Sequence, residues 1–206
     1  KALKANLSEA ALDEHNRGVL RALAFDVARS ELNAQAELLD WLEDVNKLLL
    51  PPTGDDNEHS TQVYFSPGEA CAQRIIGTMK DARGNADICV FTITDDRVTG
   101  AIIEAHQRGI NVRVISDDEK AGDMGSDVRR MAAAGIPVRV DGSPYHMHHK
   151  FAVVDGGVVL TGSYNWTVSA AKNNEENMVV SNDRKLVLAF SEEFERLWKD
   201  FAGNAL

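Results

Sequence analysis

The sequence predicts an α/β domain with a mixed, largely parallel sheet sandwiched by helices, preceded by an N-terminal helical extension. Apolar runs of buried-strand type, such as residues 88–93 (ICVFTI), alternate with helical segments from residue 63 onward. Strands that alternate with covering helices are typical of α/β sheets. A polar stretch containing two prolines and a glycine, residues 51–57, separates this part from an earlier all-helical part.

The catalytic part of the chain is expected to span residues 63–206, after a linker over residues 51–62. Its predicted strands cover residues 63–65, 88–93, 112–115, 138–140, 151–155, 158–161 and 177–180, and its helices cover 67–83, 96–108, 125–134 and 183–201. The strands at 151–155 and 158–161 flank Gly156-Gly157, which predicts a hairpin.

Residues 1–50 are predicted to form the helical extension. Leu38, Leu42, Val45 and Leu49 recur at helical spacing, which predicts one apolar face. The sequence begins at Lys1 rather than Met, so an upstream signal or anchor segment stays an alternative and the compartment is left open.

Composition restricts the class of protein. The two cysteines, Cys71 and Cys89, lie in apolar segments, so we expect core packing and no disulfide framework. No apolar run reaches the ~18 residues of a membrane span. The net charge of −10 disfavours a nucleic-acid partner, but residues 1–62 carry −6 of it, whereas residues 139–172 carry +1. A phosphate ligand is therefore compatible with the later region.

Residues 145–177 hold the side chains that indicate chemistry. On a strand, His148 and Lys150 would project from the same face, because residues i and i+2 do so. A neutral imidazole can attack phosphorus, and an ammonium group can hold phosphoryl oxygens. Gly162-Ser163-Tyr164-Asn165 follows a strand and supplies a hydroxyl and an amide as neutral donors.

These residues resemble the HxKx4Dx6GSxN signature of the phospholipase D superfamily at every fixed position, from His148 to Asn165. The similarity extends over residues 63–203 to single-motif nucleases and to the mitochondrial cardiolipin hydrolase (Zucchini) group, which includes a piRNA-pathway endonuclease. That group carries a cysteine-rich zinc-binding insertion and an N-terminal membrane helix, and this sequence shows neither. The sequence therefore favours a metal-independent endonuclease acting on DNA or RNA. A phospholipase D-type lipase such as a cardiolipin hydrolase is the alternative, and a non-catalytic phosphate-binding module is a third hypothesis.

The resemblance implies a role for each matched residue. His148 forms a phosphohistidine, and a second histidine acts as the acid and base. Because the chain holds a single signature, we expect a C2 homodimer that places both His148 side chains at one phosphate. The resemblance also implies that Lys150, Gly162, Ser163 and Asn165 lie at the phosphoryl oxygens and that Glu176 orients the imidazole. Asp155 belongs to the signature as well, but its position beside the Gly156-Gly157 turn favours a role as a brace of the hairpin over a catalytic one.

Several residues have two interpretations. Trp166 could stack on a substrate base or pack under the turn, and His146 could line the site. The histidines at 146, 148 and 149 could suggest zinc, but neighbouring strand residues face opposite ways, so we expect no metal and no cofactor. The run Asp117-Asp118-Glu119 is consistent with a cation site or, preferably, with a solvated loop.

Overall fold

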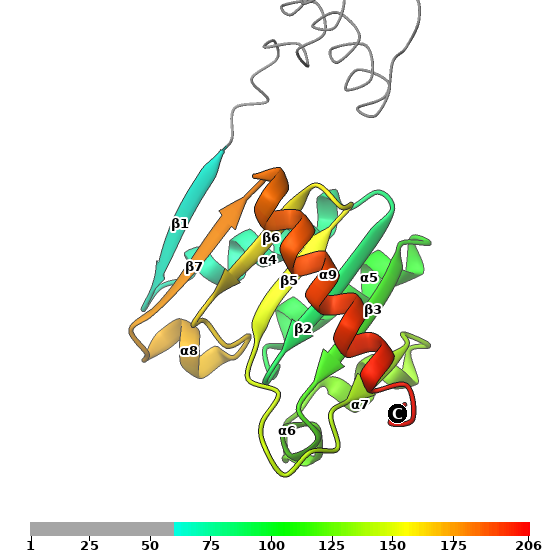
Figure 1. The fold of residues 1–206 in the computed structure, drawn as a ribbon. Helices are drawn as coiled ribbons and strands as arrows, with labels where there is room; N and C mark the ends of the chain where they lie inside the picture. Colours follow the sequence, from blue (N-terminus) through cyan, green and yellow to red (C-terminus); the bar gives the residue numbers. More distant parts are fainter. Residues whose placement is uncertain (1–59) are drawn as a thin grey trace, which may run out of the picture. The chain divides into compact units, whose positions relative to one another are not determined.

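The computed structural model describes residues 60–206 (Figure 1). The predicted helical extension over residues 1–50 and most of the predicted linker lie outside the described residues. The first strand, β1 (Thr61–Ser66), begins two residues before the predicted start of the catalytic part.

The described residues form one seven-stranded sheet in the order β1-β7-β6-β5-β2-β3-β4. The remaining strands are β2 (Asn85–Val90), β3 (Asn111–Ser116), β4 (Val138–Val140), β5 (Lys150–Val154), β6 (Val158–Gly162) and β7 (Glu176–Ser181). The predicted mixed sheet flanked by helices is confirmed. The expected predominance of parallel pairs is wrong, because only β2/β3 and β3/β4 are parallel.

The reason lies in the connections. Helical crossovers join β2 to β3 and β3 to β4, and such crossovers give parallel neighbours. The three-residue connection between β5 and β6 gives an antiparallel pair, as the Gly156-Gly157 turn predicts. The pairs β5/β2, β6/β7 and β1/β7 are antiparallel as well, and their partners are distant in the chain.

Helices cover both faces of the sheet (Figure 1). The apolar cluster on one face includes residues of α4 (Ala70–Asp81), α5 (Asp96–Gln107), α7 (Val128–Ala133) and α8 (Val168–Lys172). The cluster on the other face centres on α9 (Arg184–Asp200), shown in orange-red, which buries Val187, Phe194 and Leu197. Alternate strand residues point to alternate clusters: Ala152 belongs to the first and Phe151 to the second.

Two short helices were not predicted. The first, α6 (Asp118–Gly122), begins where we expected a loop, and the Asp117 carboxylate caps it by accepting from the Lys120 N–H at 3.0 Å. The second is α8, which Thr167 caps by accepting from the Ala170 N–H. Helices of five residues contain too little periodicity to be read from an apolar pattern. Among the described helices, none combines the length and the apolar character needed to cross a bilayer.

Asp155 braces the hairpin, as the residues suggested. It adopts φ 54° at the turn, and its carboxylate accepts backbone N–H groups of Arg83, Gly84 and Asn85 at the start of β2. Burial raises the pKa of Asp155, but these three donors outweigh it and the pKa ends below its ordinary value. The side chain thus ties the β5–β6 turn to β2.

We expect Asp155→Ala to lower the free energy of unfolding by about 1–2 kcal/mol, comparable to loss of a helix cap. Asp155→Asn should lose less, because it keeps one acceptor oxygen and tolerates a positive φ. Since the folded-state pKa is depressed, the Asp155 contribution should be present above the unfolded-state pKa and vanish as pH falls through the folded-state pKa. Urea unfolding of both variants across acidic pH measures this; equal stability of wild type and Asp155→Ala at neutral pH would contradict it.

Candidate active site

The candidate site lies along one edge of the sheet, where several strands begin or end. β5 starts at this edge with Lys150, and the register places Lys150 opposite Val90, the last residue of β2. On the other side, β6 ends at Gly162, which pairs with Met178 near the start of β7. Residues 146–150 and 162–177 are distant in sequence, and the sheet register brings them to the same edge.

His148 and Lys150 are in direct contact, as the i and i+2 spacing predicted. The Lys150 Nζ lies 2.9 Å from the His148 Nδ1 and donates to the His148 carbonyl oxygen at 2.7 Å. His148 itself lies two residues before β5, but the Phe91 N–H donates to the His149 carbonyl at 2.8 Å and continues the ladder to this point. The backbone around His148 is therefore extended even though the strand proper starts at Lys150.

Phe91 supports both side chains, and sequence reasoning missed it. Its ring centroid lies 4.5 Å from that of His148, and the Lys150 Nζ lies 4.9 Å from the Phe91 centroid. An aromatic face attracts an ammonium group, so Phe91 helps to hold Lys150 in a site where only 8% of the residue is exposed. The antiparallel β2/β5 pairing creates this neighbour relation, and no local sequence signal indicates it.

Burial and charge move both pKa values in the direction that suits phosphate chemistry. Desolvation and the nearby Lys150 lower the pKa of His148, so its imidazole is neutral at neutral pH. Desolvation lowers the pKa of Lys150 to about 8, against a smaller opposing effect of Glu176. At neutral pH the pair is therefore mainly a neutral imidazole beside an ammonium group.

The contact also determines where the imidazole proton lies. A protonated Lys150 can only donate, so the His148 Nδ1 must accept and the imidazole proton resides on Nε2. A nucleophilic Nε2 needs the opposite tautomer, with the Nδ1 proton donated to an acceptor such as a carboxylate. Within a single chain the site holds His148 in the tautomer that cannot attack through Nε2.

Glu176, the carboxylate implied for this role, does not contact His148 within the described chain. Its Oε1 accepts from the Asn174 side-chain amide at 3.3 Å. The prediction that Glu176 orients the imidazole is thus not met by the single chain.

The turn after β6 supplies neutral donors beside Lys150. Ser163 Oγ accepts from the backbone N–H and the side-chain amide of Asn177, at 3.1 and 3.3 Å, which leaves its own hydroxyl proton free to donate. Asn165 has a buried Oδ1 with no hydrogen-bond partner. Sequence reasoning assigned no role to Asn177. A Cβ at Gly162 would overlap the Asn177 carbonyl, so this close approach of β6 and β7 requires glycine.

Two residues assigned to the site lie elsewhere. Trp166 is 2% exposed and pairs with Ile93 in an isolated bridge, so the interpretation as a core residue fits the structure and stacking on a substrate does not. Asp155 lies at the opposite end of β5 from Lys150, roughly 16 Å along the strand. Both residues support the site from a distance.

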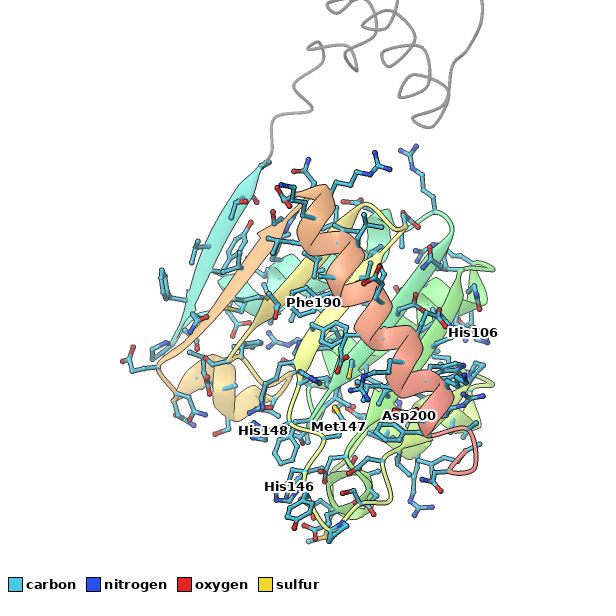
Figure 2. The ribbon with its side chains drawn as sticks, in the orientation of Figure 1. His106, His146, Met147, His148, Phe190 and Asp200 are labelled. Atoms are coloured by element: carbon cyan, nitrogen blue, oxygen red, sulfur yellow. The ribbon has the colours of Figure 1, made fainter. Side chains whose placement is uncertain are left out.

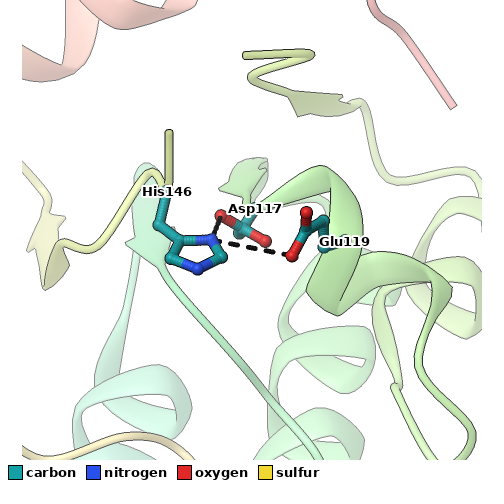
Figure 3. Close-up of side chains that lie close together, drawn as sticks. All are labelled: Asp117, Glu119 and His146. Atoms are coloured by element: carbon teal, nitrogen blue, oxygen red, sulfur yellow. Dashed lines mark hydrogen bonds and ion pairs between the residues drawn. The ribbon is translucent and has the colours of Figure 1, made fainter. Parts of the chain in front are cut away.

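His146 lies at the rim and is paired with carboxylates. Its Nδ1 is 3.0 Å from Asp117 Oδ2 and 4.0 Å from Glu119 Oε2, which Figure 3 shows at the start of α6. Its ring also meets Phe91 edge-on, with centroids 5.3 Å apart. His146 therefore joins the acidic cluster and reaches His148 only through Phe91.

A pocket of about 270 Å³ opens beside His148, between residues 141–149 and the C-terminal part of α9. Figure 2 shows His146, Met147 and His148 in succession just before the start of β5. The helix α9 crosses the sheet in the same view. The pocket lining includes Tyr145, His148, Arg196 and Phe201. The pocket reaches His148, whereas Lys150, Ser163 and Asn165 do not line it.

Comparison with known proteins agrees with this geometry. Residues 75–198 match the family model described as "Cardiolipin synthase, PLD-like domain". The chain is 41% identical over 150 residues to a protein named mitochondrial cardiolipin hydrolase from Chlamydomonas reinhardtii, covering 73% of this chain and 66% of the relative. It is 42% identical over 134 residues to the protein of the same name from Homo sapiens, covering 65% of this chain and 53% of the relative. The chain thus spans less than two thirds of the length of these relatives.

A solved structure gives the same assignment. The phospholipase D family member Nuc from Salmonella typhimurium superposes with a TM-score of 0.64 at 30% identity, covering 69% of this chain and 96% of Nuc. NucT from Helicobacter pylori, with a TM-score of 0.63 at 22% identity, shares the fold. The family match over more than half of the chain and the likeness to Nuc show that this chain belongs to the phospholipase D superfamily.

Proposed function

We propose that this chain is a phosphodiesterase that cleaves a phospholipid phosphodiester of the cardiolipin type through a phosphohistidine on His148. The observation that carries the proposal is that a neutral His148 imidazole and a nearly buried Lys150 ammonium group meet at one end of the sheet, 2.9 Å apart; their hydrogen bond is a resting arrangement that attack through Nε2 has to break. The names of the curated relatives favour the lipid over the nucleic acid that the sequence favoured.

In the proposed reaction, His148 Nε2 attacks phosphorus and the bond from phosphorus to the leaving alcohol breaks. Lys150 and the Ser163 hydroxyl hold the non-bridging oxygens, and the leaving oxygen takes a proton from a second imidazole, which has to enter the reaction in its protonated, imidazolium form. That imidazole then removes a proton from water, which attacks phosphorus and releases His148. Two small steps thereby replace one difficult displacement.

The second imidazole is proposed to come from another copy of the chain. A C2 axis at the site would place the two His148 side chains on opposite sides of one phosphate. Among the described residues, no acceptor lies at the His148 Nδ1, and Glu176 of the second copy is the carboxylate proposed to supply one. In this arrangement His148 Nδ1 would donate its proton to the carboxylate and no longer accept from Lys150, so Nε2 would be free of a proton and able to attack.

Exposed apolar side chains near the site support a lipid substrate. Tyr145 is 81% exposed at the pocket, Phe65 is 66% exposed opposite Asn177 in the sheet register, and Val168 follows the Asn165 turn at 37%. Such side chains suit acyl chains better than a polyanionic strand. A nuclease remains the second candidate, since this chain covers 96% of Nuc with a single signature of its own.

Incubating the protein in EDTA with cardiolipin vesicles and, separately, with a labelled single-stranded oligonucleotide tests the substrate. We expect cleavage of cardiolipin, lost by on the order of 10³-fold or more in His148→Ala. His106→Ala is the matched control, because His106 lies in the last turn of α5 and outside the pocket beside His148 (Figure 2). Cleavage of the oligonucleotide alone would favour the nuclease; turnover by His148→Ala at the wild-type rate would remove the mechanism.

If two chains share one site, an inactive chain should inactivate the active chain with which it pairs. When subunits exchange with a tenfold excess of His148→Ala, only about one in eleven of the wild-type chains should be paired with another wild-type chain. The activity per wild-type chain should therefore fall about elevenfold. The same excess of His106→Ala should leave the activity of the wild-type chains undiminished. Activity that does not change under excess His148→Ala would show that each chain carries a complete site.

Lys150 gives the site an alkaline limit. Because its pKa is about 8, the charge that attracts an anion disappears as pH rises through this value. Sulfate keeps its charge over this range, so its affinity should fall roughly tenfold between about pH 7 and about pH 9. Titration calorimetry measures this, and Lys150→Met should bind weakly at both pH values. Equal affinity at both pH values in the wild-type protein would contradict the role of Lys150.

A further inference from the structure

Three aspartates converge where β3 and β4 end, next to the active-site edge. Asp117 and Asp118 follow β3, and Asp141 follows β4, which pairs with β3 in parallel. One carboxylate oxygen from each lies within 4.8 Å of the other two. Asp117 is fully buried and Asp141 is 7% exposed. Three like charges are thus brought together in a poorly solvated place.

Asp141 carries the observation that points to a ligand. Its Oδ1 accepts from the Asp118 N–H at 3.0 Å, which directs the carboxylate into the cluster. Its Oδ2 is buried and has no hydrogen-bond partner. Buried carboxylate oxygens are ordinarily satisfied, because leaving one without a donor costs free energy. Burial, together with the charges of Asp117 and Asp118, raises the pKa of Asp141.

The described part of the chain offers this cluster no lysine or arginine ion pair, and Lys120 attracts Asp117 only at longer range. Lys120, the nearest lysine in sequence, donates its Nζ to Asp123 at 2.8 Å, and among the described residues no lysine or arginine forms an ion pair with the three aspartates. Asp117 accepts the backbone N–H groups of Lys120 and Met147. Among the described side chains that can carry a positive charge, only the His146 imidazole lies within ion-pair distance of Asp117, at 3.0 Å (Figure 3). The oxygen donors therefore exceed the positive charge available to them.

We propose that Asp117, Asp118 and Asp141 bind a divalent cation of the oxygen-preferring class, Ca²⁺ or Mg²⁺. Carboxylate oxygens are the ligands that these ions prefer, and the three aspartates bring one such oxygen each within reach of a common ion. A site with three protein carboxylates and otherwise water corresponds to a Kd on the order of 10⁻⁴–10⁻³ M. The cation would stand apart from the phosphate site and would take no part in the proposed reaction.

The cation would fasten the segment that leads to His148. Asp141 begins this segment, and Asp117 Oδ2 already accepts the Met147 N–H at 3.2 Å, one residue before His148. Joining Asp141 to Asp117 and Asp118 through a metal would close residues 141–147 at both ends. The proposed site is therefore a stabilising device for the loop, and it does not depend on which phosphodiester the enzyme cleaves.

The test uses the full chain, freed of metal with EDTA and then titrated with CaCl₂ or MgCl₂. At about a hundredfold excess over Kd, one of the two ions should raise the Tm by about 5–10 °C, and calorimetry should show one site per chain. Asp141→Asn and the half-buried Asp118→Asn should each weaken binding by at least about tenfold. Asp81→Asn, which removes an exposed aspartate at the end of α4, should bind like the wild type.

Three results would overturn the proposal. The first is a wild-type Tm that neither ion changes, and the second is an Asp118→Asn affinity equal to that of the wild type. The third is an Asp141→Asn protein that is more stable in EDTA and gains from the ion as much as the wild type does. Because unfolding and calorimetry require no substrate, these results are independent of whether the chain cleaves lipid or nucleic acid.

Discussion

The nearly buried ammonium group of Lys150 is the constraint on which the site depends. Placing a cation at the start of β5 is unfavourable unless polar groups surround it, and the His148 carbonyl and the Phe91 ring provide that environment. The same contacts fix the imidazole of His148, because its Nδ1 and its carbonyl oxygen both face Lys150 Nζ. A cation that is only partly compensated attracts a phosphate strongly. The buried charge of Lys150 needs polar partners when the sheet folds, and the same charge needs a negative partner when an anion binds.

Two groups of side chains with opposite charge lie at this end of the sheet, and the Phe91 ring contacts residues of both. The Phe91 ring contacts His148, Lys150 and His146, and His146 leads to Asp117. Anion-binding groups therefore gather around β5 and β6, whereas carboxylates gather after β3 and β4. This separation lets opposite charges coexist at short range without neutralising the group that binds phosphate. It also gives a bound phosphodiester a preferred side of the edge.

The sequence predicted most of the local structure and part of the site. The contact of His148 with Lys150, the Gly156-Gly157 hairpin and the bracing by Asp155 follow from spacing, turn chemistry and backbone preference, which are local properties. The order of the strands was not predicted, because the pairing of β5 with β2 and of β1 with β7 joins distant segments. Phe91 and Asn177 acquire their places from those pairings, and for that reason no motif revealed them. The expectation for Glu176 concerns a contact that one chain does not make.

The two residues that flank His148 are both held by backbone hydrogen bonds. The Met147 N–H donates to Asp117, and the His149 carbonyl accepts from Phe91, so the main chain is clamped on either side of the proposed nucleophile. The imidazole consequently moves by side-chain torsions alone. Residues 142–145 lie beyond this clamp and at the mouth of the pocket, so insertions or exchanges there would reshape substrate access while leaving the reactive nitrogen in place. In this architecture, evolution is free to diversify selectivity in one short loop without altering the chemistry.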